Sequence, residues 1–280
     1  MFKIKTIVLT MFSATLFAEN IELSLKNNNG NSSYIVQSPS QNLKAKLIFP
    51  FKFSTFDLNY AHEFSFFDIK IGSSFLLNHK TTTGKDYDWQ NDNLTVFSSS
   101  DNKIDKYSKY SLEISKDIFY DLKIFANFDY KILDMYWSNT AEEDFVKNEN
   151  SYVKDLTLKF QQEFFQHNLG LTYKNNIYKN ILVEIQPSFI YAFVKSKDTH
   201  VLRSFYIKQN SKAIGFGLKL NTTYSITDNS KIKLSLNYET LEDKNVNMDY
   251  YNVLNQKYKT LPSSYKYKNQ TIGLSYSYDF

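Results

Sequence analysis

The last nine residues, Ile272-Gly-Leu-Ser-Tyr-Ser-Tyr-Asp-Phe280, alternate between apolar or aromatic side chains and small or polar ones. Residues two apart in a β-strand lie on the same face, so this segment predicts a strand with one apolar and one polar face. The same period recurs in 231–238, 214–221 and 122–130, where Phe125 is the one exception. Because no stretch has a convincing helical period, the chain is predicted to be all-β.

Two architectures bury such faces, a soluble β-sandwich and a transmembrane β-barrel. Sandwich strands have about five residues, whereas the alternating segments of this chain are long, with Tyr and Phe at their ends. Strands that span a membrane need about 9–11 residues and carry aromatic girdles at both interfaces. The terminal Phe280 resembles the signature by which Gram-negative outer-membrane proteins are recognised for insertion. The pattern therefore favours an outer-membrane barrel.

Ten strands are expected, and single-chain bacterial barrels have even strand numbers. The expected strands cover residues 21–36, 42–60, 65–78, 105–117, 122–137, 154–173, 181–197, 210–225, 231–242 and 263–280. Both chain ends then lie on the periplasmic side, where connections are short, and the outer side carries long loops at 79–104, 138–153 and 243–262. The prediction is a ten-stranded antiparallel transmembrane β-barrel with extended outer loops. A general porin needs about 16–18 strands, so this barrel is too narrow to be one.

One strand interrupts the regular pattern. Between Phe160 and Leu169 the apolar positions change phase, which predicts a β-bulge in the sixth strand.

The first 18 residues have the features of a secretory signal peptide. A basic Met1–Lys5 segment precedes a mostly apolar stretch over 6–17, and Ala18 is a plausible cleavage point. About a dozen apolar residues are too few for a spanning helix, which needs ~20. The alternative is a buried N-terminal helix or strand. With the signal removed, residues 19–280 form the outer-membrane barrel domain.

Composition excludes several classes of site and partner. The absence of Cys excludes a disulfide framework, a thiolate metal site and a Cys nucleophile, and it suits a bacterial envelope protein. A net charge of +4 is too small to predict nucleic-acid binding. No metal is expected.

Two short acidic motifs lie in the expected outer loops. Asp86 and Asp88 are two residues apart, so in extended backbone their carboxylates point the same way and can share one proton or hold a water molecule. Asp198 and His200 have the same spacing, and a carboxylate beside an imidazole makes a competent general base near neutral pH. Taken alone, each motif is more often a set of solvated loop residues than a catalytic pair. His79, at the outer end of the third strand, is the positional rival of His200 but has no acidic neighbour two residues away.

These motifs resemble those of the omptins, outer-membrane endopeptidases of Gram-negative bacteria. Omptins carry Asp-x-Asp-Trp in the second outer loop, as in residues 86–89, and Asp-x-His in the fourth, as in 198–200. The resemblance covers the mature chain and implies that Asp198 and His200 activate water, with Asp86 and Asp88 positioning that water and the scissile carbonyl. It implies an active site that faces the cell exterior, a peptide or protein substrate, and lipopolysaccharide bound to the outer wall as an activating lipid. A monomer is expected. Ser100 matches a downstream omptin serine and is given at most an accessory role.

The chain departs from omptins in the acids that hold a basic substrate residue before the cut bond. The first outer loop, placed at 27–34, has no acid, and Ser196 occupies a second acidic position. Acids from other outer loops could substitute, and the candidates are Asp101, Asp105, Glu142 and Glu143.

Two other functions remain as alternatives. One is a non-catalytic barrel that acts as an adhesin, receptor or structural protein. The other is a lipid-modifying enzyme such as a phospholipase, which would need a Ser–His pair on the membrane-facing wall, and no such pairing is found.

Overall fold

The computed structural model describes residues 19–280, so the predicted signal peptide lies outside the described residues. In this range the chain is almost entirely β-strand, with a single 3-10 turn, η1 (Pro39–Gln41). None of its helices is long and apolar enough to cross a membrane. The strands are β1 (Asn20–Ser38), β2 (Leu43–Glu63), β3 (Asp68–Lys80), β4 (Thr82–Gln90), β5 (Asn93–Phe119), β6 (Leu122–Asp144), β7 (Glu149–Val153), β8 (Leu158–Tyr178), β9 (Ile181–His200), β10 (Phe205–Ser225), β11 (Ser230–Asn252) and β12 (Lys257–Asp279).

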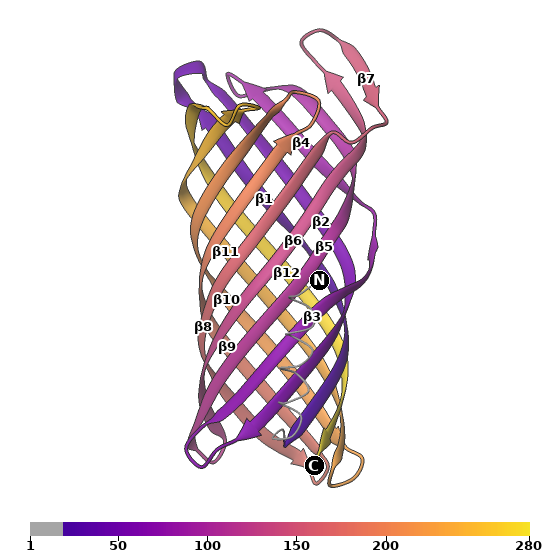
Figure 1. Cartoon of the computed structure of the whole chain (residues 1–280), viewed down its shortest axis with the longest axis vertical. Helices are drawn as coiled ribbons and strands as arrows, with labels where there is room; N and C mark the ends of the chain where they lie inside the picture. The colour runs from indigo at the N-terminus through magenta and orange to yellow at the C-terminus, as the bar shows by residue number, and fades with distance from the viewer. Residues whose placement is uncertain (1–18) are drawn as a thin grey trace.

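The strands form one antiparallel sheet that closes into a ring (Figure 1). β1 pairs with both β2 and β12, and the pairing runs on through β3, β5, β6, β8, β9, β10 and β11. We call this closed ring the barrel, and it has the ten strands expected from the sequence. The sheet has twelve strands in all, because β4 prolongs the wall position of β3 and β7 adds to β6 outside the ring.

The two ends of the barrel differ in their connections. Asn20 pairs with Asp279, so both ends of the described chain lie at one end, where strands are joined by short turns at 64–67, 120–121, 179–180 and 226–229. We call this the turn end. At the other end, which we call the hairpin end, strand pairs extend further and β7 stands clear of the ring (Figure 1).

The long outer loops expected from the sequence are mostly strands. β4 and β5 continue to a tight turn at Asn91 and Asp92, both with positive φ, and only residues 253–256 separate β11 from β12. The backbone N–H and C=O groups of these hairpins pair with each other, so the strands extend well past the expected loop boundaries. The sequence predicts loops here because polar residues dominate these segments and obscure the period-two signal, although Val246 and Met248 of β11 are buried in the core.

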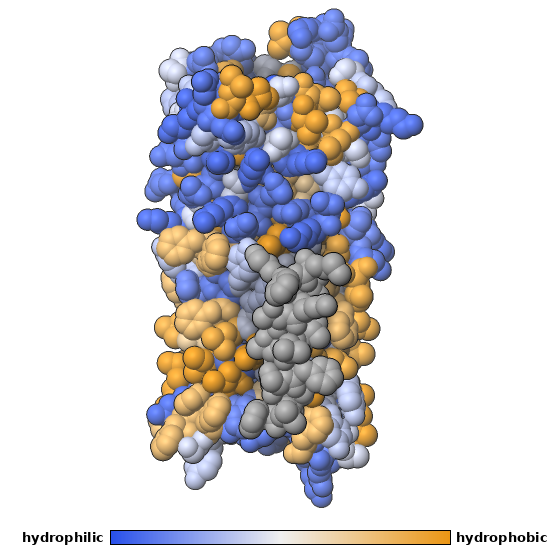
Figure 2. All heavy atoms as spheres, viewed as in Figure 1, coloured by the Kyte–Doolittle hydropathy of each residue, from blue (hydrophilic) through white to orange (hydrophobic). Residues whose placement is uncertain are grey.

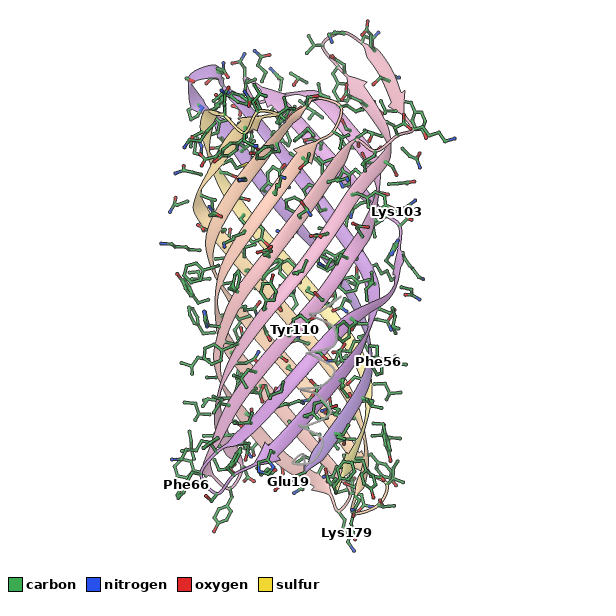
Figure 3. All side chains as sticks on the ribbon, in the orientation of Figure 1. Glu19, Phe56, Phe66, Lys103, Tyr110 and Lys179 are labelled. Atoms are coloured by element: carbon green, nitrogen blue, oxygen red, sulfur yellow. The ribbon has the colours of Figure 1, made fainter. Side chains whose placement is uncertain are left out.

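The inside and outside of the barrel exchange polarity along its axis. Toward the turn end, apolar side chains cover the outer wall (Figure 2), among them Leu25, Phe56, Ile71, Leu169, Phe189, Ile272 and Leu274. Phe56 projects away from the wall at this level, and Lys103 lies higher on the barrel (Figure 3). Toward the hairpin end the outer wall is polar and the interior is an apolar core that includes Phe49, Phe51, Leu133, Trp137, Phe160 and Phe164.

This exchange of polarity corrects the predicted bulge in the sixth strand. In β8, Phe160 and Phe164 point inward into the core, whereas Phe165 and Leu169 point outward. The register with β6 and with β9 runs through this region without a shift. The apolar residues change phase because the apolar environment changes sides, so the bulge prediction is wrong.

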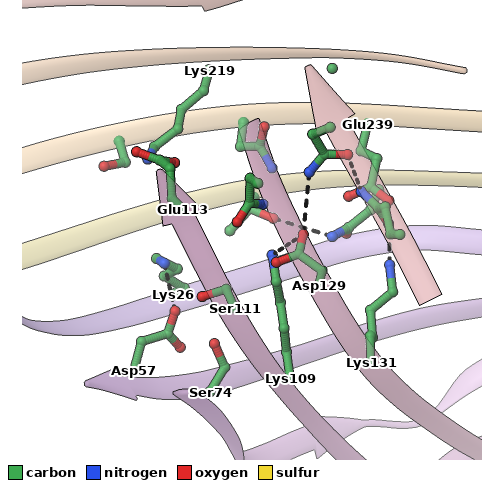
Figure 4. Close-up of a pocket in the computed structure, with 18 of the residues that line it drawn as sticks. Lys26, Asp57, Ser74, Lys109, Ser111, Glu113, Asp129, Lys131, Lys219 and Glu239 are labelled. Atoms are coloured by element: carbon green, nitrogen blue, oxygen red, sulfur yellow. Dashed lines mark hydrogen bonds and ion pairs between the residues drawn. The ribbon is translucent and has the colours of Figure 1, made fainter. Parts of the chain in front are cut away.

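A polar cavity of about 190 Å³ lies inside the barrel, below the apolar core (Figure 4). Lysine and acidic side chains line it in equal number and form ion pairs: Lys26–Asp57 (2.5 Å), Lys109–Asp129 (3.0 Å) and Lys131–Glu239 (3.3 Å). A buried charge is tolerated only when it is paired, which explains why lysines and acids alternate here.

Candidate active site

The first acidic pair lies on β4 at the hairpin end. Asp86 and Asp88 leave this strand on the same face, as their spacing predicted, although the segment is a strand and not a loop. β4 is held between β2 and β5, where Asp86 is opposite Leu47 and Ser98. Paired backbone on both sides fixes the direction of the two carboxylates.

A glycine allows the core to pack directly beneath this pair. At Gly84 a Cβ atom would lie 2.4 Å from the indole ring of Trp137. A side chain at this position would displace the ring, so glycine lets Trp137 fill the space under β4.

The second pair ends β9. His200 Nε2 lies 3.6 Å from Oδ2 of Asp198, and the Asp198 side chain is buried. The imidazole stacks on Phe205, with ring centroids 4.3 Å apart, and Phe205 pairs with His200 at the start of β10. Tyr34 of β1 donates a hydrogen bond from its hydroxyl to the same Oδ2. The imidazole is thus fixed by a ring on one side and by a carboxylate on the other.

The two pairs face each other across the barrel, because β4 and β9 are four wall positions apart in the ring. Burial raises the pKa of Asp86 well above its usual range, and the charges of Asp88 and Asp198 raise it further. Burial also raises the pKa of Asp88, against the opposing charges of Arg203 and His200. The four predicted residues thus lie within electrostatic range of one another, and Asp86 holds its proton to a higher pH than an ordinary aspartate.

Three polar atoms of this site have no hydrogen-bond partner among the described residues. Oδ1 of Asp86, Oδ1 of Asp198 and Nε2 of His200 are each sealed from solvent. Buried polar atoms are normally paired, so leaving these three without a hydrogen bond has an energetic cost that the fold tolerates at this place. In residues 19–280, no cluster of three or more His, Asp or Glu side chains is arranged to hold a metal ion.

Sequence reasoning missed three residues that act on the site, Tyr34, Arg203 and Tyr250. Burial raises the pKa of Tyr250, and the charges of Asp198, Asp88 and Asp86 raise it further, so this side chain lies near the site. Arg203, the single arginine of the chain, lies 3.9 Å from Glu142, and its charge opposes the rise that burial causes in the pKa of Asp86 and Asp88. Its rarity was a signal that could have been used. Tyr34 and Tyr250 had none, since distant strands bring them in.

Among the four acids proposed as substitutes, Glu142 is the one directed at the site. It receives a hydrogen bond from Ser98, pairs with Arg203 and acts on the charge state of Asp86. Asp101 is bound instead to Asn139, and Asp105 and Glu143 are exposed to solvent.

Ser100 and His79 lie apart from the four predicted residues. Ser100 is buried in a chain of hydroxyl groups, where it bonds to Thr140, which in turn bonds to Thr157. His79 is exposed at the end of β3. Neither has a recorded contact with the Asp–His pair.

The layer beneath Asp198 is polar but uncharged. The segment 27–34, expected as an outer loop, lies within β1, and the first turn of the hairpin end is at η1. Gln162 donates to Ser196 and to the Tyr265 hydroxyl, both at 3.2 Å. In the part of the chain that the structure describes, neither the segment 27–34 nor Ser196 brings a carboxylate to this layer.

Comparison with known proteins gives a fold match. Neither a scan against protein-family models nor a search of curated proteins found a match. Among solved structures, the outer membrane protease OmpT from Escherichia coli has a TM-score of 0.79 at 14% identity, covering 93% of this chain and 96% of that one. The translocator domain of the autotransporter NalP from Neisseria meningitidis reaches 0.44 at 10% identity, with 99% and 95% covered. The chain therefore has the fold of OmpT, which confirms the resemblance to omptins at the level of fold.

Proposed function

We propose that this chain is an outer-membrane endopeptidase of the omptin type. The observation that supports it is the convergence of an Asp–His pair and an Asp–Asp pair from opposite walls, with sealed and partnerless atoms in both pairs. A protein that only adheres or binds has no need to bring these four groups together at the expense of burying carboxylates.

His200 is the general base of the proposed reaction. It takes a proton from a water molecule, whose oxygen forms a bond to the carbon of the scissile carbonyl. The Asp198 carboxylate stabilises the imidazolium that results. His200 then passes this proton to the leaving nitrogen as the C–N bond breaks, which regenerates the base.

The protonated Asp86 is the electrophilic partner in this scheme. A neutral carboxyl group can donate a hydrogen bond, and the oxygen of the tetrahedral intermediate needs such a donor. For Asp88, the charges of Arg203 and His200 oppose the rise in pKa that burial causes. Asp88 is proposed to orient the attacking water. The two carboxyls thus take different roles because their surroundings differ.

Glu142 is proposed to hold a basic side chain of the substrate. Its carboxylate is partly exposed near the Asp–Asp pair, and its cationic partner is Arg203, a largely exposed side chain 3.9 Å away. A substrate Lys or Arg can replace Arg203 at this carboxylate without burying an unpaired charge.

The proposed location is the outer membrane. The apolar side chains on the outer wall toward the turn end, which we call the apolar belt, would lie in the bilayer, and the hairpin end would face the cell exterior. Lysines begin just above the belt on the outer faces of β9 and β10, where Lys195 lies over Phe165, and Lys197 and Lys208 lie over Tyr206. These ammonium groups fit the phosphates of lipopolysaccharide, which the resemblance implies as an activating lipid. The chain is proposed to act as a monomer.

Cleavage of a peptide library by the refolded chain, in detergent with and without lipopolysaccharide, tests this function. The protease is expected to cut at a restricted set of bonds and to need the lipid. If a correctly folded chain cuts nothing across pH and lipid conditions, the alternative of a non-catalytic adhesin, receptor or structural barrel is favoured.

A further inference from the structure

We propose that Tyr34 is a positioning residue for the Asp198–His200 pair, acting by a hydrogen bond that crosses the barrel interior. This inference rests on the proposed peptidase function and adds to it a residue from β1, far from both motifs in the sequence. Tyr34 is not assigned any contact with the substrate.

The contact joins two strands that do not pair. β1 and β9 are four wall positions apart, and the Tyr34 hydroxyl spans the interior to reach Oδ2 of Asp198. The same oxygen faces His200 Nε2 at 3.6 Å. Because Oδ2 is shared, the tyrosine fixes which oxygen of Asp198 is presented to the imidazole.

The ring of Tyr34 is held rigidly enough to act as such a support. It is 2% exposed, and its centroid lies 6.0 Å from those of Phe49 and of Phe160. On the sheet it is flanked by Leu47 of β2 and Tyr265 of β12. A side chain packed in this way positions its hydroxyl with little freedom.

The hydroxyl keeps its proton, so it acts as a donor and not as a base. Burial raises the pKa of Tyr34 well above its usual range, and the charge of Asp198 raises it further. Among the described residues, Tyr34 is the one recorded hydrogen-bond donor to the Asp198 side chain. Without it, this buried carboxylate would be free to rotate away from His200.

The substitution Tyr34→Phe tests the proposal, because it keeps the ring and removes only the hydroxyl. We expect kcat to fall by about 100-fold with KM unchanged, as misplacement of a catalytic group does. Tyr265→Phe is the matched control, since it removes a buried hydroxyl from the paired residue, and that hydroxyl bonds Gln162 and not Asp198. The control is expected to keep the wild-type kcat.

A double-mutant cycle with Asp198→Asn separates positioning from general packing. If Tyr34 acts through Asp198, the loss of kcat caused by Tyr34→Phe disappears in the Asp198→Asn background. Additive losses of kcat, or a wild-type kcat in Tyr34→Phe, would overturn the proposal.

Failure of the proposed function gives a different result. If the wild type cleaves no peptide, the peptidase proposal fails, and the same cycle is measured on the melting temperature of the folded barrel. Non-additive shifts would retain the Tyr34–Asp198 support, whereas additive shifts would reject it.

Discussion

The charge of Asp198 on β9 raises the pKa of Asp86 on β4, although the two strands are four positions apart in a ring of ten. The barrel is narrow enough for side chains from opposite walls to meet inside it. Carboxylates held this close and this deep repel each other, so the site has an unfavourable energy that a function would explain.

Asp86→Asn is expected to stabilise the barrel at neutral pH. An unfolded aspartate ionises near pH 3.8, whereas folded Asp86 holds its proton to higher pH. Between those two values the folded state binds more protons, so wild-type stability falls as pH rises. Unfolding measured in detergent from about pH 4 to pH 8 is expected to show a smaller fall in the variant. If the free energy of unfolding fell with pH as steeply in Asp86→Asn as in the wild type, Asp86 would not be the group responsible for the fall.

The activity of Asp86 variants tests its role as a donor. Asp86→Ala is expected to lower kcat by about 100-fold or more, the usual effect of losing an oxyanion donor. Asp86→Asn keeps an N–H group that can donate a hydrogen bond, and it is expected to retain more activity than Asp86→Ala. Equal inactivity of the two variants would mean that Asp86 acts as a carboxylate base instead.

Glu142 and Arg203 are expected to change specificity in opposite directions. Glu142→Gln is expected to raise KM for peptides with basic residues by about tenfold, or 1.4 kcal/mol, since the charge pair is lost. Arg203→Gln is expected to lower that KM, because it frees Glu142. Neutral peptides of the same length are the control, and a parallel change for basic and neutral peptides would argue against this role.

Most of the barrel could be predicted from the sequence. Period-two alternation gave the ten ring strands and the position of the chain ends, because in each strand one face is apolar. The pattern misled where the environment changed: at Phe160 to Leu169 the apolar side moves from the core to the outer wall, and in the hairpins polar residues outnumber the few that reach the core, such as Met248. Spacing alone predicted the shared faces of Asp86 with Asp88 and of Asp198 with His200. Tyr34 and Tyr250 come from other strands, so only the folded chain brings them to the site.

Lys131 is expected to be essential for stability inside the barrel. Its ammonium group lies 3.3 Å from Glu239 and 4.2 Å from the ring centroids of Phe164 and Tyr267. Lys131→Met leaves a buried carboxylate unpaired and is expected to lower the free energy of unfolding by about 3–5 kcal/mol. Urea unfolding of this variant would be compared with Lys131→Met/Glu239→Gln, expected to recover much of the loss, and with Lys103→Met on the polar outer wall, expected to change little. Equal stability of the single and double variants would contradict the importance of the pair.

The central claim is that His200 activates water for peptide hydrolysis, and one comparison tests it most directly. Wild type and His200→Ala, each refolded with lipopolysaccharide, would be given the same peptide library, and the cut bonds would be mapped by mass spectrometry. We predict defined cut sites for the wild type and the loss of all of them in the folded variant. Cleavage at the same bonds and the same rate by His200→Ala would contradict the account.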